Sequence, residues 1–274
     1  MSTMNSYRGK KTVLMFPRLG HGHISPFLEL AKKLSNTNLF NIYLCSTPAN
    51  LDSVKKNLKN DVDSPSITLV ELHLSTLPEL PPHLHTTNGL PLHLMPLLKE
   101  AFDKSSPQFS RILNTLKPHL LIYDMIQSWA PVSAADRGIP SVMFIATSAT
   151  MAATMFHLYY FSEPRKGTPF PFPKFFFRTY EQNHMTEILE SSANNVKDKN
   201  RVMGCVGKSS RIVLVKSFKE IEGDHADYLS RLTGKKVVSV GPLVANPPCH
   251  AEIVLTAFGS DKDCNITCVV LDGF

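Results

Sequence analysis

A histidine and an aspartate each stand shortly after an apolar run of this 274-residue chain, where they could act together on a proton. His23 follows the run 12–16 and lies two residues before a predicted helix cap, and Asp124 follows the run 119–123. The positive end of a helix dipole disfavours a charged histidine, and a carboxylate on the far ring nitrogen would fix its tautomer. The pair is therefore suited to taking a proton from a hydroxyl group. From spacing alone, a purely structural histidine remains the alternative.

The elements that must position these side chains are predicted from alternating apolar runs and amphipathic stretches. This alternation is typical of parallel βαβ units and indicates an α/β fold with a Rossmann-like, doubly wound, mostly parallel sheet. Ligands of such sheets bind at the carboxyl ends of the strands, which is where His23 and Asp124 are expected. The predicted strands are 12–16, 41–46, 67–72, 119–123, 141–145, 211–215 and 236–240.

The first helix is the best specified by its sequence. Ser25 is predicted to cap its N-terminus, and Pro26 suits the first helical position. Apolar residues then recur at the helical period, so one face of the helix should pack on the sheet; they are Phe27, Leu30, Ala31 and Leu34.

Two proline-rich stretches interrupt the pattern, at 77–96 and 163–178. Loops at the rim of an α/β sheet commonly form the walls of ligand sites. The second stretch also carries a set of phenylalanines, namely Phe170, Phe172, Phe175, Phe176 and Phe177. Surface connections with some packed aromatic residues are the alternative that the sequence leaves open.

Two other kinds of site fit the residues around His23 less well. Gly20 and Gly22 suggest a dinucleotide-binding turn, but Ser25 occupies the place of the third glycine, and no acidic residue follows the second strand. His21 and His23 could bind a metal ion, but no further ligand stands at a suitable spacing. We therefore predict neither a bound cofactor nor a metal site.

The distribution of charge argues against binding to nucleic acid. The net charge of +6 comes from 29 basic and 23 acidic residues that are spread along the chain. The densest basic group contains no aromatic residue and is interpreted as a solvated helix face; it comprises Lys197, Lys199, Arg201, Lys208 and Arg211.

A reducing compartment suits the cysteines, which are five in number and form no C-x-x-C pair. No secretory signal is visible at the N-terminus. The uncharged stretch 138–162 is interpreted as a strand followed by a buried helix from about Ala149, not as a membrane span. We therefore expect a cytoplasmic protein.

Four stretches, taken together and in this order, resemble plant UDP-glycosyltransferases (UGTs). The first is 16–26 (FPRLGHGHISP), which is similar to the family's opening element with its G-H-x-x-P histidine. The second is 121–130 (LIYDMIQSWA) with the following 134–140 (AADRGIP). The others are 146–150 (ATSAT) and 240–243 (VGPL), the last of which resembles the start of the family's interdomain linker.

The resemblance implies the N-terminal, acceptor-binding domain of a GT-B fold over residues 1–244. It implies that His23 is the general base and that Asp124 orients it. It also implies that the sugar is transferred with inversion at its anomeric carbon and that the reaction requires no metal ion. It assigns acceptor contacts to Arg18, Gly20, Met125 and Thr147. The acceptor would be a small plant metabolite such as a flavonoid, a terpenoid or one of their glycosides, and the sugar donor would be a UDP-sugar.

The sequence also departs from the family. Members often carry a threonine that touches the transferred sugar at or beside the position of Ala146, and Thr147 is the nearest hydroxyl here. The W-A-P-Q and H-C-G-W-N-S elements of the donor-binding domain are absent. Residues 245–274 are expected to be a linker and an atypical tail, from a truncated or alternatively spliced product or a fragment. Such a chain would use a UDP-sugar only with a supplied donor domain, or would be a non-catalytic acceptor-binding module or a heteromerising isoform.

Overall fold

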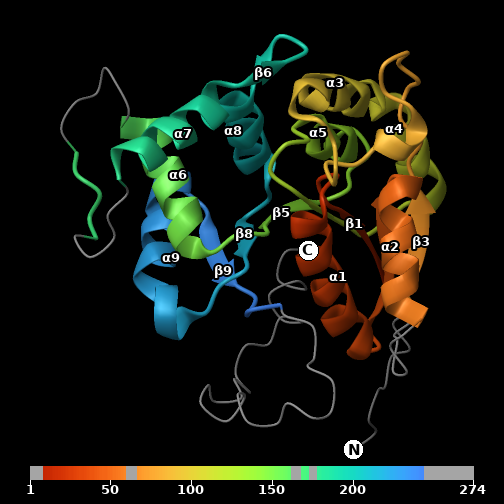
Figure 1. The fold of residues 1–274 in the computed structure, drawn as a ribbon. Helices are drawn as coiled ribbons and strands as arrows, with labels where there is room; N and C mark the ends of the chain where they lie inside the picture. Colours follow the sequence, from red (N-terminus) through yellow and green to blue (C-terminus); the bar gives the residue numbers. More distant parts are fainter. Residues whose placement is uncertain (1–8, 60–66, 162–167, 173–177, 244–274) are drawn as a thin grey trace, which may run out of the picture.

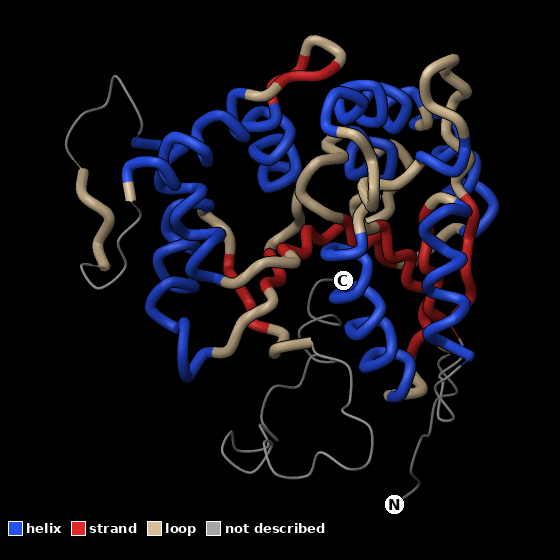
Figure 2. The backbone as a smooth tube through the Cα atoms, in the orientation of Figure 1, coloured by secondary structure: helices blue, strands red, loops and turns tan. Residues whose placement is uncertain are grey.

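A seven-stranded parallel sheet forms the centre of the computed structural model, which describes residues 9–59, 67–161, 168–172 and 178–243 (Figures 1 and 2). The strand order is β3-β2-β1-β4-β5-β8-β9. The sheet confirms the predicted α/β class, and every predicted strand agrees with an observed one to within one residue at each end. The strands are β1 (Lys11–Phe16), β2 (Phe40–Ser46), β3 (Ile67–Glu71), β4 (Leu120–Tyr123), β5 (Ser141–Ile145), β8 (Ile212–Val215) and β9 (Lys236–Ser239).

The strands read as continuous apolar runs because helices cover both faces of the sheet. Along β1, Val13 and Met15 belong to the apolar cluster on one face, whereas Leu14 and Phe16 belong to the cluster on the other. All four side chains are fully buried. This double burial fixes the register of the central strands, because a shift by one residue would exchange the two faces.

Helices surround the sheet in two layers (Figure 1). The apolar face of α1 packs on the Val13 side, as predicted, and α3, α4, α5 and α8 pack on the Leu14 side. An antiparallel hairpin of two short strands, β6 (Ser192–Ala193) and β7 (Val196–Lys197), precedes α8. The α-helices are α1 (His21–Asn36), α2 (Pro48–Lys59), α3 (Met95–Lys104), α4 (Ser106–Leu116), α5 (Trp129–Ala135), α6 (Ala149–Phe161), α7 (Thr179–Glu190), α8 (Asp198–Lys208) and α9 (Lys219–Thr233).

The start of α1 differs from the prediction. Gly20 is the N-cap, its carbonyl accepts hydrogen bonds from the backbone N–H groups of His23 and Ile24 at 2.9 Å each, and Ser25 lies inside the helix. Pro26 has no N–H group, so it donates no helical hydrogen bond to the backbone carbonyl of Gly22, four residues earlier. The helix tolerates this loss because Gly22 is exposed and water can donate to its carbonyl instead. His23 therefore sits in the first helical turn instead of two residues before the cap.

The strand order reverses between β1 and β4, and this reversal creates the crevice of a doubly wound sheet. From β1 the chain proceeds outward to β2 and β3, then returns to β4 on the other side of β1. Phe16 and Tyr123, the last residues of the two strands, are paired in register. The segments that follow them, which carry His23 in the first turn of α1 and Asp124 directly after β4, consequently lie at the same point of the sheet edge.

The stretch 138–162 contains β5 and α6, as predicted from its sequence. Within the described ranges, no helix has the length and apolar character required to cross a membrane. The first proline-rich stretch, 77–96, forms a bridge between Leu77 and Leu80, two short 3-10 helices, η1 (Pro82–Leu84) and η2 (Leu92–Leu94), and the first turn of α3. Residues 163–167, 173–177 and the predicted tail 245–274 lie outside the described residues.

The interpretation of the basic group as a solvated helix face is wrong for Arg201. Its side chain is only 2% exposed and donates two hydrogen bonds to the Asp103 carboxylate of α3, at 2.7 and 2.8 Å. Lys99 of α3 pairs with Asp198 of α8 beside it. No local sequence pattern predicts this pairing, because the partners are almost 100 residues apart. Lys208 and Arg211 are exposed, as expected.

Candidate active site at the β1 and β4 strand ends

His23 and Asp124 are in direct contact at the crevice between β1 and β4. The Nδ1 atom of His23 lies 2.9 Å from Oδ2 of Asp124. The imidazole is 20% exposed, whereas the carboxylate is completely buried. An ionised carboxylate can only accept hydrogen bonds, so the shared proton is on Nδ1. This arrangement leaves Nε2 with a lone pair that can accept a proton.

Two backbone N–H groups complete the surroundings of the Asp124 carboxylate. The N–H of Arg18 donates to Oδ2 at 3.1 Å, and the N–H of Met125 donates to Oδ1 at 2.7 Å. Burial alone would raise the pKa of Asp124, but the adjacent His23 and these donors outweigh burial and hold the pKa below its usual value. Asp124 is therefore an ionised acceptor at neutral pH.

Gln127 joins the same two strand ends and was not identified from the sequence. Its side-chain Nε2 donates to the carbonyl oxygen of Phe16 at 2.7 Å, and the residue is fully buried. Together with the bond from Arg18 to Asp124, it ties the loop after β1 to the loop after β4. No sequence pattern marks this role, because the two partners are 111 residues apart.

Gly20, which the family resemblance assigns to the acceptor site, packs directly against Thr87. A Cβ atom at this position would lie 2.5 Å from the hydroxyl oxygen of Thr87, so the absent side chain makes room for Thr87. The N–H of Thr87 donates to the carbonyl of Leu19 at 2.7 Å. The segment around η1 and η2 is thereby anchored beside the first turn of α1.

Further hydrogen bonds hold this segment to the start of α2. The hydroxyl of Thr47 donates to the carbonyl of His85 at 2.6 Å, and the hydroxyl of Thr86 donates to Oδ1 of Asn50 at 2.7 Å. Asn50 and Thr47 are fully buried. The proline-rich segment is thus a fixed wall next to the candidate site.

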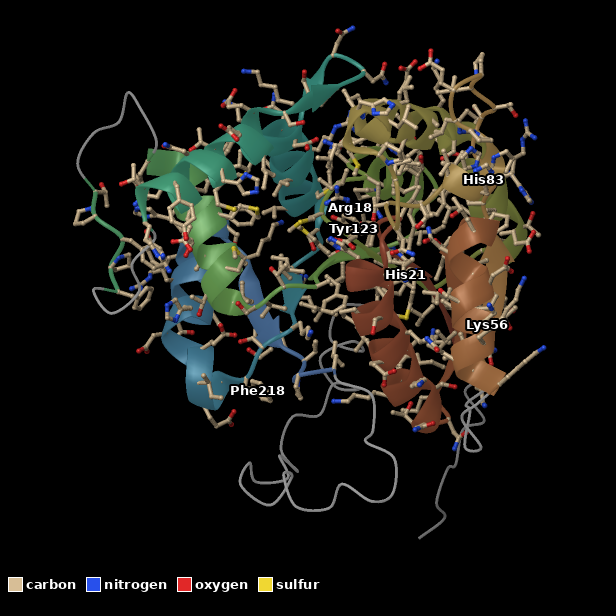
Figure 3. All side chains as sticks on the ribbon, viewed as in Figure 1. Arg18, His21, Lys56, His83, Tyr123 and Phe218 are labelled. Atoms are coloured by element: carbon tan, nitrogen blue, oxygen red, sulfur yellow. The ribbon has the colours of Figure 1, made fainter. Side chains whose placement is uncertain are left out.

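A surface hollow of about 260 Å³, a volume that includes space open to solvent, lies beside the segments that carry the pair, and we call it the Arg18 hollow. Figure 3 shows Arg18 at the strand ends with His21 and Tyr123. The wall contains five apolar side chains, one threonine and two cationic residues, which come from the loop after β1, from the η1–α3 segment and from the loop after β4. They are Arg18, Leu19, Thr87, Met95, Leu98, Lys99, Phe102 and Ile126.

Thr147 lies in the turn between β5 and α6, and no hydrogen bond joins it to the pair among the described residues. This turn is held by Glu222, a role that no sequence pattern indicates. Its carboxylate accepts hydrogen bonds from the N–H groups of Ala149 and Thr150 at 3.2 and 3.1 Å, and from the hydroxyl of Ser217. Burial would raise the pKa of Glu222, but these donors lower it. Glu222 therefore serves as the cap of α6.

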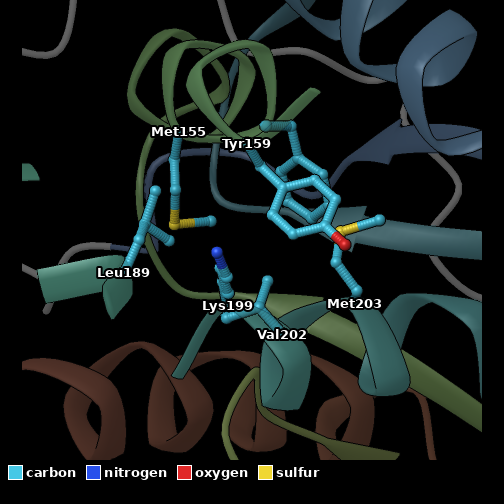
Figure 4. A pocket seen from close by; sticks show the side chains of 7 residues that line it. Met155, Tyr159, Leu189, Lys199, Val202 and Met203 are labelled. Carbon is cyan, nitrogen blue, oxygen red and sulfur yellow. The ribbon is translucent and has the colours of Figure 1, made fainter. Parts of the chain in front are cut away.

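A second hollow, of about 160 Å³, lies between α6, α7 and α8. Figure 4 shows Met155 and Tyr159 of α6 facing Lys199 and Val202 of α8. It shares no lining residue with the Arg18 hollow. Among the residues that the structure describes, no three His, Cys, Asp or Glu side chains gather in a way that could hold a metal ion.

Comparisons with known proteins agree on one family. The model of the glycosyltransferase N-terminal domain matches residues 10–245. UDP-glucosyltransferase 29 of Panax ginseng is 48% identical over 250 residues, which cover 91% of this chain and 53% of the relative. The beta-D-glucosyl crocetin beta-1,6-glucosyltransferase of Gardenia jasminoides is 44% identical over 234 residues, covering 85% of this chain and 51% of the relative.

Solved structures show the same fold. A Glycyrrhiza uralensis UGT complexed with glycyrrhetinic acid 3-O-monoglucuronide superimposes with a TM-score of 0.68 at 20% sequence identity. The superposition covers 86% of this chain and 49% of that protein. The fold is thus that of one half of a GT-B structure, and the chain spans about half the length of the relatives it matches.

Proposed function

Because this chain belongs to the plant UDP-glycosyltransferases and contains their N-terminal domain, we propose that it binds a small hydroxyl-bearing acceptor and deprotonates it for sugar transfer. The observation that carries this proposal is the 2.9 Å contact between His23 Nδ1 and Asp124 Oδ2 at the reversal of strand order. A partly exposed base with a buried, ionised partner is suited to the removal of a hydroxyl proton.

In the proposed reaction, Nε2 of His23 takes the proton of the acceptor hydroxyl. The acceptor oxygen forms a bond to the anomeric carbon of the UDP-sugar as the bond from that carbon to the UDP oxygen breaks, with inversion. The electron pair of the broken bond leaves with UDP. Asp124 keeps its hydrogen bond to Nδ1 throughout and stabilises the imidazolium that forms. The carboxylate remains unprotonated.

We assign the acceptor to the Arg18 hollow and to the turn after β5. Arg18 and Met125 flank Asp124, and Thr147 offers a half-buried hydroxyl at the neighbouring strand end. Gly20 contributes indirectly by admitting Thr87 to the wall of the hollow. The apolar wall suits a terpenoid or flavonoid body, and the name of the Gardenia relative, which specifies a glucosylated substrate, supports a glycoside as the acceptor.

Transfer is proposed to require a donor-binding half, because the relatives named as glycosyltransferases are about twice as long as the matched region. UDP-sugar binding is assigned to that half. We place the protein in the cytoplasm on the basis of its cysteines: Cys45 and Cys205, the two within the described residues, are buried free thiols.

Calorimetric titration of the chain with a panel of terpenoid and flavonoid glycosides tests the acceptor site. We expect saturable binding of at least one glycoside. Met95→Trp should weaken its affinity about tenfold, because the larger side chain fills the hollow. Leu92→Trp is the matched control, because Leu92 lies in the same segment but is 86% exposed. Absence of binding by the whole panel, or equal weakening by both substitutions, would reject the assignment.

A further inference from the structure

Arg18 presents an uncompensated positive charge to the candidate acceptor site. Its backbone N–H is fixed on the Asp124 carboxylate, and its half-buried side chain lines the Arg18 hollow. Within the described part of the chain, the guanidinium makes no ion pair and donates no hydrogen bond. A guanidinium carries five N–H donors and matches a carboxylate in a two-pronged arrangement.

The charged groups that line the hollow do not neutralise Arg18, and the fully buried Asp124 carboxylate next to it in the fold is already bound by His23 and two backbone N–H groups. Lys99 also lines the hollow, but it is paired with Asp198 and so contributes little net charge there. Behind it, Arg201 is paired with Asp103. None of the residues that line the hollow is acidic. An anion in the hollow would therefore meet Arg18 without competition from a carboxylate of the protein wall.

The remaining wall makes the site selective for an amphiphilic anion. Leu19, Leu98, Phe102 and Ile126 are all at least nine-tenths buried and form an apolar lining. An inorganic anion could not use this lining, whereas a ring system with an acidic group could use both features. Interactions between charges are also stronger beside apolar, partly dehydrated surfaces than in open water.

We propose that the preferred acceptors carry a carboxylate, and that Arg18 is the residue that selects them. This inference rests on the proposed function, because it assigns the chemical class of the acceptor at the same site. The carboxylate could belong to the sugar of a glucuronide or to the aglycone of an acidic terpenoid. In both cases it forms paired hydrogen bonds with the guanidinium while the apolar body contacts the lining.

Calorimetric titrations of the full chain with two pairs of compounds show whether the recognised carboxylate belongs to the sugar or to the aglycone. The first pair is 4-nitrophenyl β-D-glucuronide and 4-nitrophenyl β-D-glucoside, which differ at the sugar carboxylate. The second pair is a triterpenoid acid 3-O-glucoside and its methyl ester, which differ at the aglycone carboxylate. We expect the acid of at least one pair to bind about tenfold more tightly than its neutral partner at low ionic strength, with the preference decreasing as salt is added.

Arg18→Gln should abolish this preference, because it should weaken binding of each acid about tenfold more than binding of its neutral partner. Lys56→Gln is the matched control, because it removes one positive charge from an exposed position of α2 that does not line the hollow (Figure 3). Equal binding within both pairs, or a preference that survives in Arg18→Gln, would overturn the inference while leaving the proposed function intact. Absence of binding by all four compounds and by the glycoside panel would reject both.

Discussion

At the residue scale, Asp124 links the chemistry of the site to the stability of the fold. Its folded-state pKa is held below the value of about 3.9 expected in the unfolded chain. The ionised group therefore stabilises the fold above about pH 4, and this stabilisation is lost as the pH falls through the folded-state pKa. Asp124→Asn should lower the free energy of unfolding at pH 6, and the difference from the wild type should shrink towards pH 3.

Chemical denaturation monitored by circular dichroism between pH 3 and pH 6 measures this difference. The comparison of the two proteins at each pH removes the effect of the other acidic groups, which titrate in both. A difference in unfolding free energy that stays constant over this range would contradict the inferred pKa shift, because it would mean that unfolding does not change the protonation of Asp124.

At the element scale, the ion pair between Arg201 and Asp103 joins α8 to α3 in the helical layer on the Leu14 side of the sheet. Arg201→Ala would leave the largely buried Asp103 without its partner, and we expect a loss of about 3–5 kcal/mol in the free energy of unfolding. Lys208→Ala is the control on the same helix, and its effect should be below about 0.5 kcal/mol because Lys208 is exposed. Urea unfolding of both variants provides the measurement, and comparable small losses would contradict the structural role of the pair.

Elements that depend on local pattern could be predicted from the sequence, whereas those that depend on distant partners could not. The strands followed from apolar runs bounded by polar residues, and β5 and α6 followed from one uncharged stretch. The helix start at Gly20 was missed because Ser25-Pro26 is a strong local cap signal, which tertiary packing of Gly20 against Thr87 overrides. The contacts of Arg201 and Glu222 join elements about 70 to 100 residues apart, and no local pattern encodes them.

The two side chains of the candidate pair could be placed from sequence because each follows a strand in a fold that brings strand ends together. Their hydrogen bond adds what the sequence did not contain, namely the ring nitrogen that faces the carboxylate. Gln127 and Thr87 complete the surroundings, and both were missed since their roles depend on bonds to loops elsewhere in the chain.

At the scale of the whole molecule, the doubly wound sheet brings the proposed base His23 and the Arg18 hollow to one edge, in the fold of one half of a GT-B protein. The chain covers about half of its relatives, so transfer is best measured in a chimera of residues 1–243 with the donor-binding half of the Panax ginseng relative. The rate at which a catalytically active chimera forms glycoside from UDP-glucose measures the contribution of the proposed base.

The decisive measurement is this rate in His23→Ala and in His21→Ala. His21 is the matched control because it lies in the same helical turn, is exposed, and contacts only the Ser53 hydroxyl among hydrogen-bonding groups of the described chain. The account predicts a fall of about 10²- to 10⁴-fold for His23→Ala and a change below about twofold for His21→Ala. An unchanged rate in His23→Ala would contradict the assignment of the base.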